Sequence, residues 1–327
     1  MSPWFKPCLA VLLLTGILVI TPMSDLGAAD YPSKPIQLIV PFPPGGGSDI
    51  TARFINDRLS ALFGQPVLVV NKAGGGGISG YYAALAAPAD GYVVTILGPT
   101  HVLAPLLTKG VTLNIFKEFT LINMSVTCPG IICVNKDSPL RTLEELIAEA
   151  KKNPGKLTYS SSGYGSSAHF RGDLFKMYTK TDITHVPLDG SAPSITAVMG
   201  GHIQVGFFEL GLMLKHLQAK SFRPLAVMAQ KRLKDFPEIP TVVEKGFPNI
   251  ILDTWQGFFV RSETPKPMVD KAAKIFKEVL KEKEIIENFE KTGWFVENLG
   301  PIEGGEYLAK DQQTRSAVAK AGHIVPK

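Results

Sequence analysis

The chain has 327 residues, with 34 Lys and Arg against 29 Asp and Glu, a net charge of +5, 31 Gly, 25 Pro and 3 Cys. Charged residues make up 19% of it and the Gly and Pro residues follow no period, which excludes a coiled coil, a collagen-like rod and a charge-rich disordered tail. The basic residues are scattered along the chain, so we expect no nucleic-acid partner.

The first thirty residues have the pattern of a secretory signal peptide. Lys6 precedes an apolar run over residues 9–20, and small residues follow at 27–29. This order predicts cleavage after Ala29 and a protein exported to the periplasm. The apolar run is shorter than the ~20 residues of a membrane-spanning helix, and an uncleaved anchor is the alternative interpretation.

After this segment, short apolar strands alternate with amphipathic helices. Asp49 is expected to cap a helix that ends at Gly64. Thr142 and Glu145 form a capping box at the start of a later helix. Strands that are apolar on both faces predict parallel sheets covered by helices, an α/β fold. The strands are expected at 36–40, 67–70, 93–97, 131–134, 157–160, 184–186 and 203–208, and the chain from 264 onward is expected to be mainly helical.

Two cysteines follow the predicted signal peptide, Cys128 and Cys133. An extended chain would separate them by ~17 Å, which is beyond bridging distance unless Pro129-Gly130 turns the chain back. We therefore expect two buried free thiols, with a disulfide as the alternative in an oxidising compartment. We also expect Trp255 and Phe258 to lie in the core.

Three loops share one design, in which an apolar strand leads into a Gly- and Ser-rich turn and then into a helix. They cover residues 41–49, 72–80 and 161–169. Open α/β sheets bind ligands beyond the carboxyl ends of their strands. Free amides at helix N-termini suit a carboxylate or a phosphate. The pattern therefore predicts a cleft for a small anion, and His101 faces it or is an ordinary loop histidine.

Two enzymatic alternatives have weaker support in the sequence. Residues 75–80 satisfy the G-x-G-x-x-G pattern, but no acidic residue ends the next strand, so we expect no dinucleotide cofactor. A hydrolase could use Ser166 or Ser167 with His169 and Asp173. The Gly-x-Ser-x-Gly elbow is missing, and serine before a helix is more often a cap. The histidine spacing suggests no metal site.

Several segments together carry a family resemblance. They are residues 41–49, 71–77, 90–92, 145–146 with 153–157, 162–166, 185–187, 223–227 and 240–246. In this order they resemble the substrate-binding proteins of tripartite tricarboxylate transporters, the Bug receptors. The resemblance implies a two-lobed type II periplasmic binding protein fold, each lobe a mostly parallel sheet flanked by helices, with the ligand cleft between the lobes. It divides the chain into a first lobe of 30–130 plus 253–327 and a second lobe of 131–252.

The resemblance also implies a function and a set of ligand-binding residues. The protein would capture a small carboxylate (a di- or tricarboxylate, an amino-acid-like acid or an aromatic acid) and deliver it, as a monomer without cofactor, metal or catalysis, to membrane subunits of such a transporter. The alternatives are a secreted hydrolase and a ligand-loaded partner of a membrane signalling protein. The resemblance places ligand contacts in residues 42–49 and 163–169 and near 189–190, and the loop pattern adds Gly77 and His101. The expected ligand-binding residues are Phe42, Pro44, Gly45, Gly46, Ser48, Asp49, Gly77, His101, Gly163, Gly165, Ser166, Ser167, His169, Asp189 and Gly190.

Three positions depart from the family pattern. Leu188-Asp189 stands where members usually carry Tyr-Lys, which replaces a base with an acid at the expected cleft edge. The strand that usually ends in an acidic, an apolar and an aromatic residue is here residues 204–207, and Ser316 replaces a common C-terminal aromatic residue. These departures concern the ligand and leave the expected fold unchanged.

Overall fold

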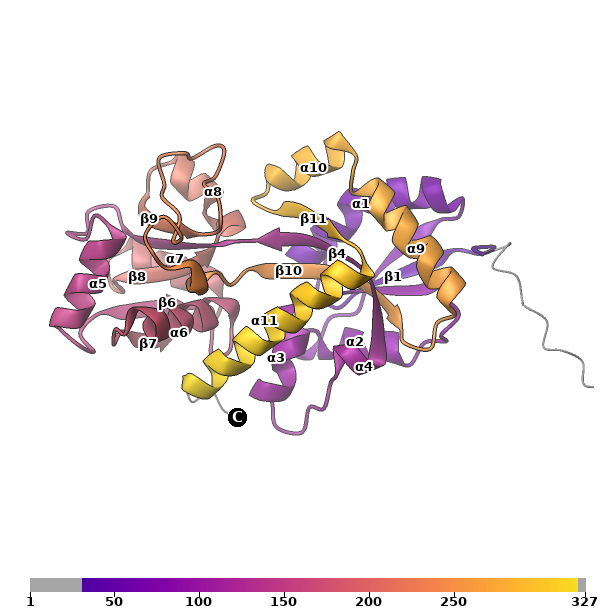
Figure 1. Cartoon of the computed structure of the whole chain (residues 1–327), viewed down its shortest axis with the longest axis horizontal. Helices are drawn as coiled ribbons and strands as arrows, with labels where there is room; N and C mark the ends of the chain where they lie inside the picture. The colour runs from indigo at the N-terminus through magenta and orange to yellow at the C-terminus, as the bar shows by residue number, and fades with distance from the viewer. Residues whose placement is uncertain (1–30, 323–327) are drawn as a thin grey trace, which may run out of the picture. The chain divides into compact units, whose positions relative to one another are not determined.

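The computed structural model describes residues 31–322, whose strands form two β-sheets with helices packed on them (Figure 1). The predicted signal peptide lies outside the described residues. We call each sheet with the helices packed on it a lobe. The first sheet contains, in order across it, β11 (Phe295–Leu299), β4 (Phe119–Cys128), β10 (Thr254–Arg261), β3 (Val93–Leu97), β1 (Ile36–Val40) and β2 (Val67–Asn71). The second contains β7 (Thr184–Pro187), β6 (Thr158–Ser161), β8 (Val205–Glu209), β5 (Gly130–Asn135) and β9 (Phe222–Met228).

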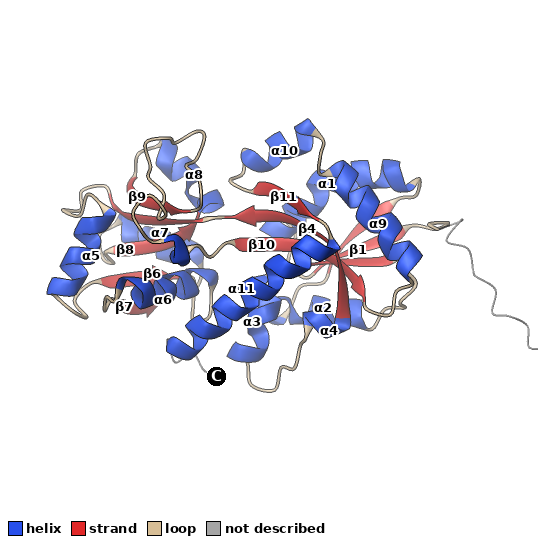
Figure 2. Cartoon of the chain, in the orientation of Figure 1, coloured by secondary structure: helices blue, strands red, loops and turns tan. Residues whose placement is uncertain are grey.

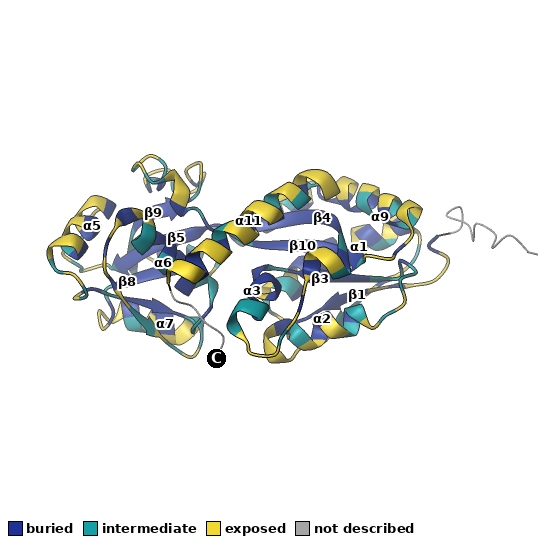
Figure 3. Ribbon diagram, turned by 60° about the horizontal axis from the view of Figure 1, so that its bottom comes forward, coloured by how far each residue is buried: buried dark blue, intermediate teal, exposed yellow. Residues whose placement is uncertain are grey.

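Helices connect these strands and cover the sheets (Figure 2). The helices are α1 (Gly47–Phe63), α2 (Ile78–Leu85), α3 (Pro99–Leu107), α4 (Ile115–Glu118), α5 (Leu143–Lys152), α6 (Ser167–Thr179), α7 (Ser191–Met199), α8 (Leu210–Gln218), α9 (Lys266–Val279), α10 (Lys283–Glu290) and α11 (Pro301–Ala321), with short 3₁₀ turns η1 (Gly75–Gly77) and η2 (Pro248–Ile250). The strands are mostly buried, whereas the outer helix faces are exposed (Figure 3). No helix among these residues has the length and apolar character needed to cross a membrane.

Both sheets are mixed, with fewer parallel pairs than expected. In the first sheet β1 pairs in parallel with β2 and β3, as the β-α-β pattern predicts. The long strand β10 is antiparallel to both of its neighbours, β3 and β4. In the second sheet β6 pairs in parallel with β7 and β8, whereas β5 is antiparallel to β8 and β9. Neighbouring strands that a helix connects therefore pair in parallel. The strands next to the two segments by which the chain crosses between the sheets are antiparallel to their neighbours.

Helix ends follow the local signals in the sequence. Helix α1 ends at Phe63, and Gly64 follows with a left-handed backbone, φ 69°, where its amide donates to the carbonyl of Ser60. Helix α5 begins after Thr142, whose hydroxyl accepts from the amide of Glu145. The Glu145 carboxylate accepts from the amide of Arg141. These bonds satisfy amides that have no partner inside a helix.

The core contains the predicted aromatic side chains and several buried charges. Trp255 and Phe258 are fully buried on β10, as predicted. Arg315 of α11 is also fully buried, and its Nε donates to Asp311 Oδ2 at 2.7 Å. The indole of Trp255 donates to the same carboxylate oxygen at 2.8 Å. The ion pair and the indole thus attach α11 to the first sheet.

Cys128 and Cys133 are both free and buried, which confirms the expectation of two free thiols. Burial raises the pKa of the Cys128 thiol to about 12 and that of Cys133 above its usual range. We expect neither thiol to react with a thiol reagent at neutral pH in the folded protein, and both to react after denaturation. Mass spectrometry of labelled protein measures this. Labelling of native protein, or a denatured mass lower by two hydrogens, would contradict it.

Candidate functional site

Two adjoining cavities lie where the β1–α1 loop approaches helix α8. The larger, which we call the main cavity, has a volume of about 580 Å³, a size typical of small-molecule sites. Gly45, Gly46 and Gly47 line it from the first lobe, and Gly211 and Leu212 line it from the second. Its remaining lining residues are Ile50, Thr51, Cys128, Glu209, Leu214, Lys215, Phe289, Lys291, Thr292 and Trp294.

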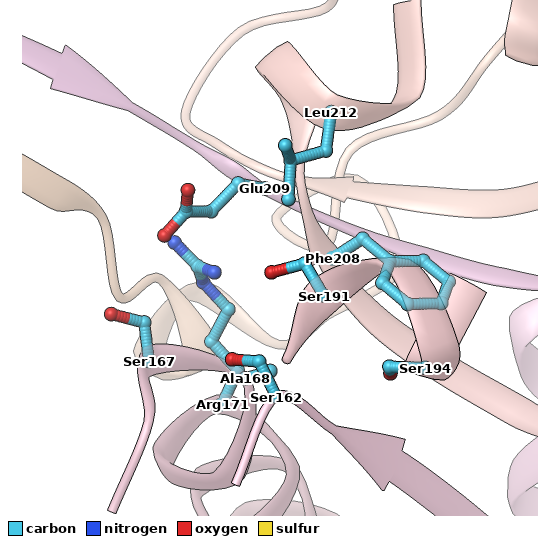
Figure 4. A pocket seen from close by; sticks show the side chains of 9 residues that line it. All are labelled: Ser162, Ser167, Ala168, Arg171, Ser191, Ser194, Phe208, Glu209 and Leu212. Atoms are coloured by element: carbon cyan, nitrogen blue, oxygen red, sulfur yellow. The ribbon is translucent and has the colours of Figure 1, made fainter. Parts of the chain in front are cut away.

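The smaller cavity, which we call the recess, has a volume of about 30 Å³, room for roughly two water molecules or one small head group. It lies at the carboxyl ends of β6 and β8 (Figure 4). Glu209 and Leu212 line both cavities, so the recess adjoins the main cavity. The other residues that line it are Ser162, Ser167, Ala168, Arg171, Ser191, Ser194 and Phe208.

The first-lobe wall is held in shape by Asp49, although not in the way that the sequence predicts. The N-cap of α1 is Gly46, and Asp49 lies inside the first turn of the helix. Its carboxylate accepts from the amide of Gly45 at 2.9 Å, from Asn71 Nδ2 at 2.9 Å and from Arg53 Nε at 2.9 Å. Asp49 therefore orients the glycine loop by binding an amide before the helix rather than by capping the helix.

The charge of Asp49 is compensated inside the protein. The carboxylate is 2% exposed. The Arg53 guanidinium and the hydrogen bonds from Gly45 and Asn71 lower the pKa of Asp49 to about 2. The main cavity is lined by Gly45, Gly46 and Gly47 at the start of α1, whereas Asp49 itself lines neither cavity.

The second-lobe wall begins with the turn before α6. Ser166 caps this helix, because its hydroxyl accepts from the amide of His169 at 3.3 Å. The amide of Gly165 donates to His169 Nδ1 at 2.9 Å, and His169 Nε2 lies 3.4 Å from Asp173 Oδ2. Both ring nitrogens of His169 thus face partners other than a serine. The geometry supports the role of Ser166 as a cap and not as a nucleophile.

A pair of stacked histidines braces the same turn. The rings of His169 and His185 lie 3.9 Å apart and nearly parallel. His185 Nε2 lies 2.7 Å from the hydroxyl oxygen of Ser161, whose Oγ also donates to the carbonyl of Gly163. These contacts fix the loop between β6 and α6, so the start of α6 is held rigidly at the recess.

The N-termini of two helices border the recess. Ser167 and Ala168 open α6, and Ser191 opens α7 after its N-cap, Gly190. The first amides of a helix have no acceptor within it, and they carry the positive end of the helix dipole. Two such ends at one cavity favour an anionic group.

Arg171 and Glu209 are the charged side chains that line the recess, and neither is among the ligand-binding residues predicted from the sequence. Figure 4 shows the guanidinium of Arg171 among the recess serines, directed toward Glu209. The signal for Glu209 was present, because it directly follows a predicted strand and ligands bind beyond strand ends. Arg171 carries no comparable signal, since a basic residue on an amphipathic helix usually faces solvent.

Only some of the expected ligand residues come together at these cavities. Gly45 and Gly46 line the main cavity, and Ser167 lines the recess. Gly190 caps the helix that borders the recess. The other expected residues line neither cavity: Phe42, Pro44, Ser48, Asp49, Gly77, His101, Gly163, Gly165, Ser166, His169 and Asp189. Of these, Asp49, Gly165, Ser166 and His169 hold the lining loops in place, and Asp189 is exposed.

His101 lies behind the β1–α1 loop, buried to 1% exposure. Its Nδ1 accepts from the amide of Gly98 at 3.2 Å, and its ring packs against Tyr81 and the edge of Phe42. Burial lowers the pKa of His101 to about 4, so the ring is neutral at physiological pH. It borders a separate cavity of about 130 Å³. His101 lies on helix α3 rather than in a loop, it lines neither the main cavity nor the recess, and Gly77 lies against its ring.

The two mixed sheets and the adjoining cavities between their loops define an α/β solute-binding protein of the periplasmic class. A family model described as "Tripartite tricarboxylate transporter family receptor" matches residues 51–319. Protein BugT of Bordetella pertussis is 30% identical over 313 residues, which cover 94% of this chain and 93% of BugT. The chain therefore belongs to the tripartite tricarboxylate transporter receptor family, a family of solute receptors, which confirms the resemblance.

Solved structures agree with this assignment. A TctC solute binding protein from Polaromonas, without ligand, is 27% identical with a TM-score of 0.79, over 89% of this chain and 99% of that one. Rpa4515 of R. palustris, solved with adipate, is 28% identical with a TM-score of 0.77, over 91% of this chain and 100% of that one. The expected periplasmic binding protein fold is confirmed.

Proposed function

We propose that this protein is an exported periplasmic receptor that captures a small carboxylate and delivers it to a membrane transporter of the tripartite tricarboxylate type, without changing it chemically. The observation that supports this most directly is the recess, where the N-termini of α6 and α7 border a cavity with the buried guanidinium of Arg171. A carboxylate suits such a cavity. The relative Rpa4515, solved with adipate, is consistent with the same ligand class.

The proposal includes the organisation of the mature protein. We propose that the leader is removed after Ala29, that the first lobe comprises 30–130 and 253–327, and that the second comprises 131–252. The protein acts as a monomer without a cofactor. The strands change from the first sheet to the second between Cys128 and Gly130, and return between Met228 and Thr254, which supports this division.

A carboxylate panel tests the proposal. Mature protein is heated with succinate, glutarate, adipate, citrate or benzoate, and with sugars and amines, while unfolding is followed by fluorescence. At a ligand concentration near 100 times its Kd, we expect the free energy of unfolding to rise by about 2.7 kcal/mol. Adipamide, which has the length of adipate without its charges, is the matched control and should give no shift.

The proposal also requires that the ligand stays intact. Proton NMR of the responding carboxylate after long incubation with the protein should show an unchanged spectrum. A shift with sugars or amines and none with any carboxylate would contradict the ligand class. Turnover of the carboxylate would contradict a receptor without catalysis.

A further inference from the structure

Arg171 has one donor group that no acceptor among residues 31–322 binds. The side chain is 0% exposed, and its Nε donates to the carbonyl of Leu252 at 2.9 Å. Its Nη2 donates to Thr254 Oγ1 at 3.0 Å. Its Nη1 is buried without an acceptor among the described residues. A buried, charged donor without a partner is unfavourable, and an acceptor that reaches Nη1 would remove this cost.

Glu209 supplies a negative charge in the same recess. One carboxylate oxygen, Oε1, accepts from Thr254 Oγ1 at 2.7 Å. Thr254 thus accepts from Arg171 and donates to Glu209, which holds the two charged groups on either side of one hydroxyl. The guanidinium of Arg171 and the carboxylate of Glu209 attract each other, and among the described residues Thr254 joins them through two hydrogen bonds. Arg171 Nη1 keeps no acceptor there, so this donor remains for a ligand.

The two charges distinguish between classes of carboxylate. A simple carboxylate beside Nη1 gains from Arg171 and the helix N-termini, but it also lies near the like charge of Glu209. A carboxylate with a neighbouring ammonium satisfies both groups, because the ammonium donates to Glu209. The recess, at about 30 Å³, admits only a head group of this size, and the rest of the molecule would occupy the main cavity of about 580 Å³.

We propose that the recess binds the α-amino carboxylate group of an amino acid. The carboxylate lies on Arg171 Nη1 and the first amides of α6 and α7, and the ammonium lies on Glu209. The side chain of the ligand extends into the main cavity past Leu212 toward Trp294, where Lys215 and Lys291 can accompany a second acidic group. This inference rests on the proposed carboxylate receptor and narrows its ligand class.

Three matched ligand pairs test the inference by titration calorimetry on the mature protein. They are L-2-aminoadipate with adipate, L-glutamate with glutarate, and L-norleucine with hexanoate, and within each pair the main difference is the α-ammonium. We expect the amino acid of the best-binding pair to have a Kd at least ~10-fold lower than its partner, as a charge-assisted hydrogen bond allows.

Glu209→Gln tests whether the negative charge of Glu209 binds the ammonium of the ligand, because glutamine has nearly the same shape without the charge. The amide keeps an acceptor for Thr254, so the fold should be retained. We expect the Kd of the amino acid to rise by ~10- to 100-fold, and the Kd of the matched acid to stay constant or to fall. Glu306→Gln, an exposed acid on α11 that lines neither cavity, is the matched control and should change neither value.

Arg171→Met tests the carboxylate half of the site. We expect it to weaken both members of a pair, with circular dichroism and the Tm showing whether the variant is folded. If it fails to fold, Glu209→Gln alone decides, because that side chain is partly exposed. Tighter binding of the simple acid in every pair, or an equal effect of Glu209→Gln on both members, would overturn the inference while leaving the carboxylate receptor intact. No binding by any of the six compounds would overturn the inference, and it would overturn the carboxylate receptor only if succinate, citrate and benzoate also gave no response in the panel.

Discussion

Replacing Asp311 with alanine should lower the free energy of unfolding by about 3–5 kcal/mol. Asp311 Oδ2 accepts from Arg315 Nε at 2.7 Å and from the Trp255 indole at 2.8 Å. Arg315 is 0% exposed, so the variant leaves a positive charge buried without its partner and an indole N–H without an acceptor. The cost of an unpaired buried charge exceeds the mean cost of a point substitution.

Urea unfolding followed by tryptophan fluorescence measures this effect. Asp311→Leu combined with Arg315→Met, which removes both charges, should restore most of the stability that the single variant loses. Asp270→Ala, in the exposed ion pair with Lys266, is the control and should cost less than ~1 kcal/mol. A loss of the same small size for Asp311→Ala would show that this pair is solvated in solution.

Replacing Asp49 with asparagine should cost about 1–2 kcal/mol of stability at neutral pH. The two carboxylate oxygens accept from three donors, on Gly45, Arg53 and Asn71. An asparagine offers one acceptor oxygen and an amide nitrogen that cannot accept, so at least one of these donors loses its partner. If Asp49 were an N-cap, asparagine would replace it at almost no cost in stability, because the two residues cap equally well. Asp49 lies inside the helix, so this argument does not apply to it.

The effect should depend on pH in a defined direction. The folded pKa of Asp49 is about 2, lowered from 3.8, so its contribution to stability is fully present above pH ~4 and is lost as the pH falls toward 2. The difference in unfolding free energy between the native protein and Asp49→Asn should therefore shrink over this interval. Asp57→Asn, an exposed position on the same helix, should change stability by less than ~0.5 kcal/mol. If the difference in unfolding free energy between the native protein and Asp49→Asn stayed constant down to pH 2, the carboxylate of Asp49 would not be stabilised in its charged form by Arg53 and its hydrogen bonds.

The sequence predicts the fold well where local pattern and burial agree. Strands β1 and β3 have the predicted bounds, and the helix stop at Gly64 is confirmed. Strands β4, β9, β10 and β11 are not among the strands predicted from the sequence. Strand β4 buries Asn123, Ser125 and Thr127, polar residues whose burial depends on distant partners such as Asn298 and Glu297. Strand β9 contains Pro224, which argues against a strand when only the sequence is read.

The candidate site likewise contains features that the nearby sequence predicts and features that depend on residues far away in the chain. The Gly- and Ser-rich loops at Gly45 and Ser167 are readable from their own residues and their place between a strand and a helix. Arg171 could not be predicted, because the acceptors that permit its burial, at Leu252 and Thr254, lie about eighty residues further along the chain. The loops of the site can thus be predicted from their own residues, whereas its buried charge depends on side chains and carbonyls far away in the sequence.

The planar guanidinium of Arg171 also holds the segment by which the chain returns from the second sheet to the first. Its Nε and Nη2 are bonded to Leu252 and Thr254, while Arg315 donates to the carbonyl of Asp253 between them. The five donors of a guanidinium are fixed in one rigid fork. A ligand charge on Nη1 would thus pull on the same rigid group that anchors this returning segment. An anion on Nη1, as proposed, would therefore contact the same side chain that binds Leu252 and Thr254 in this returning segment.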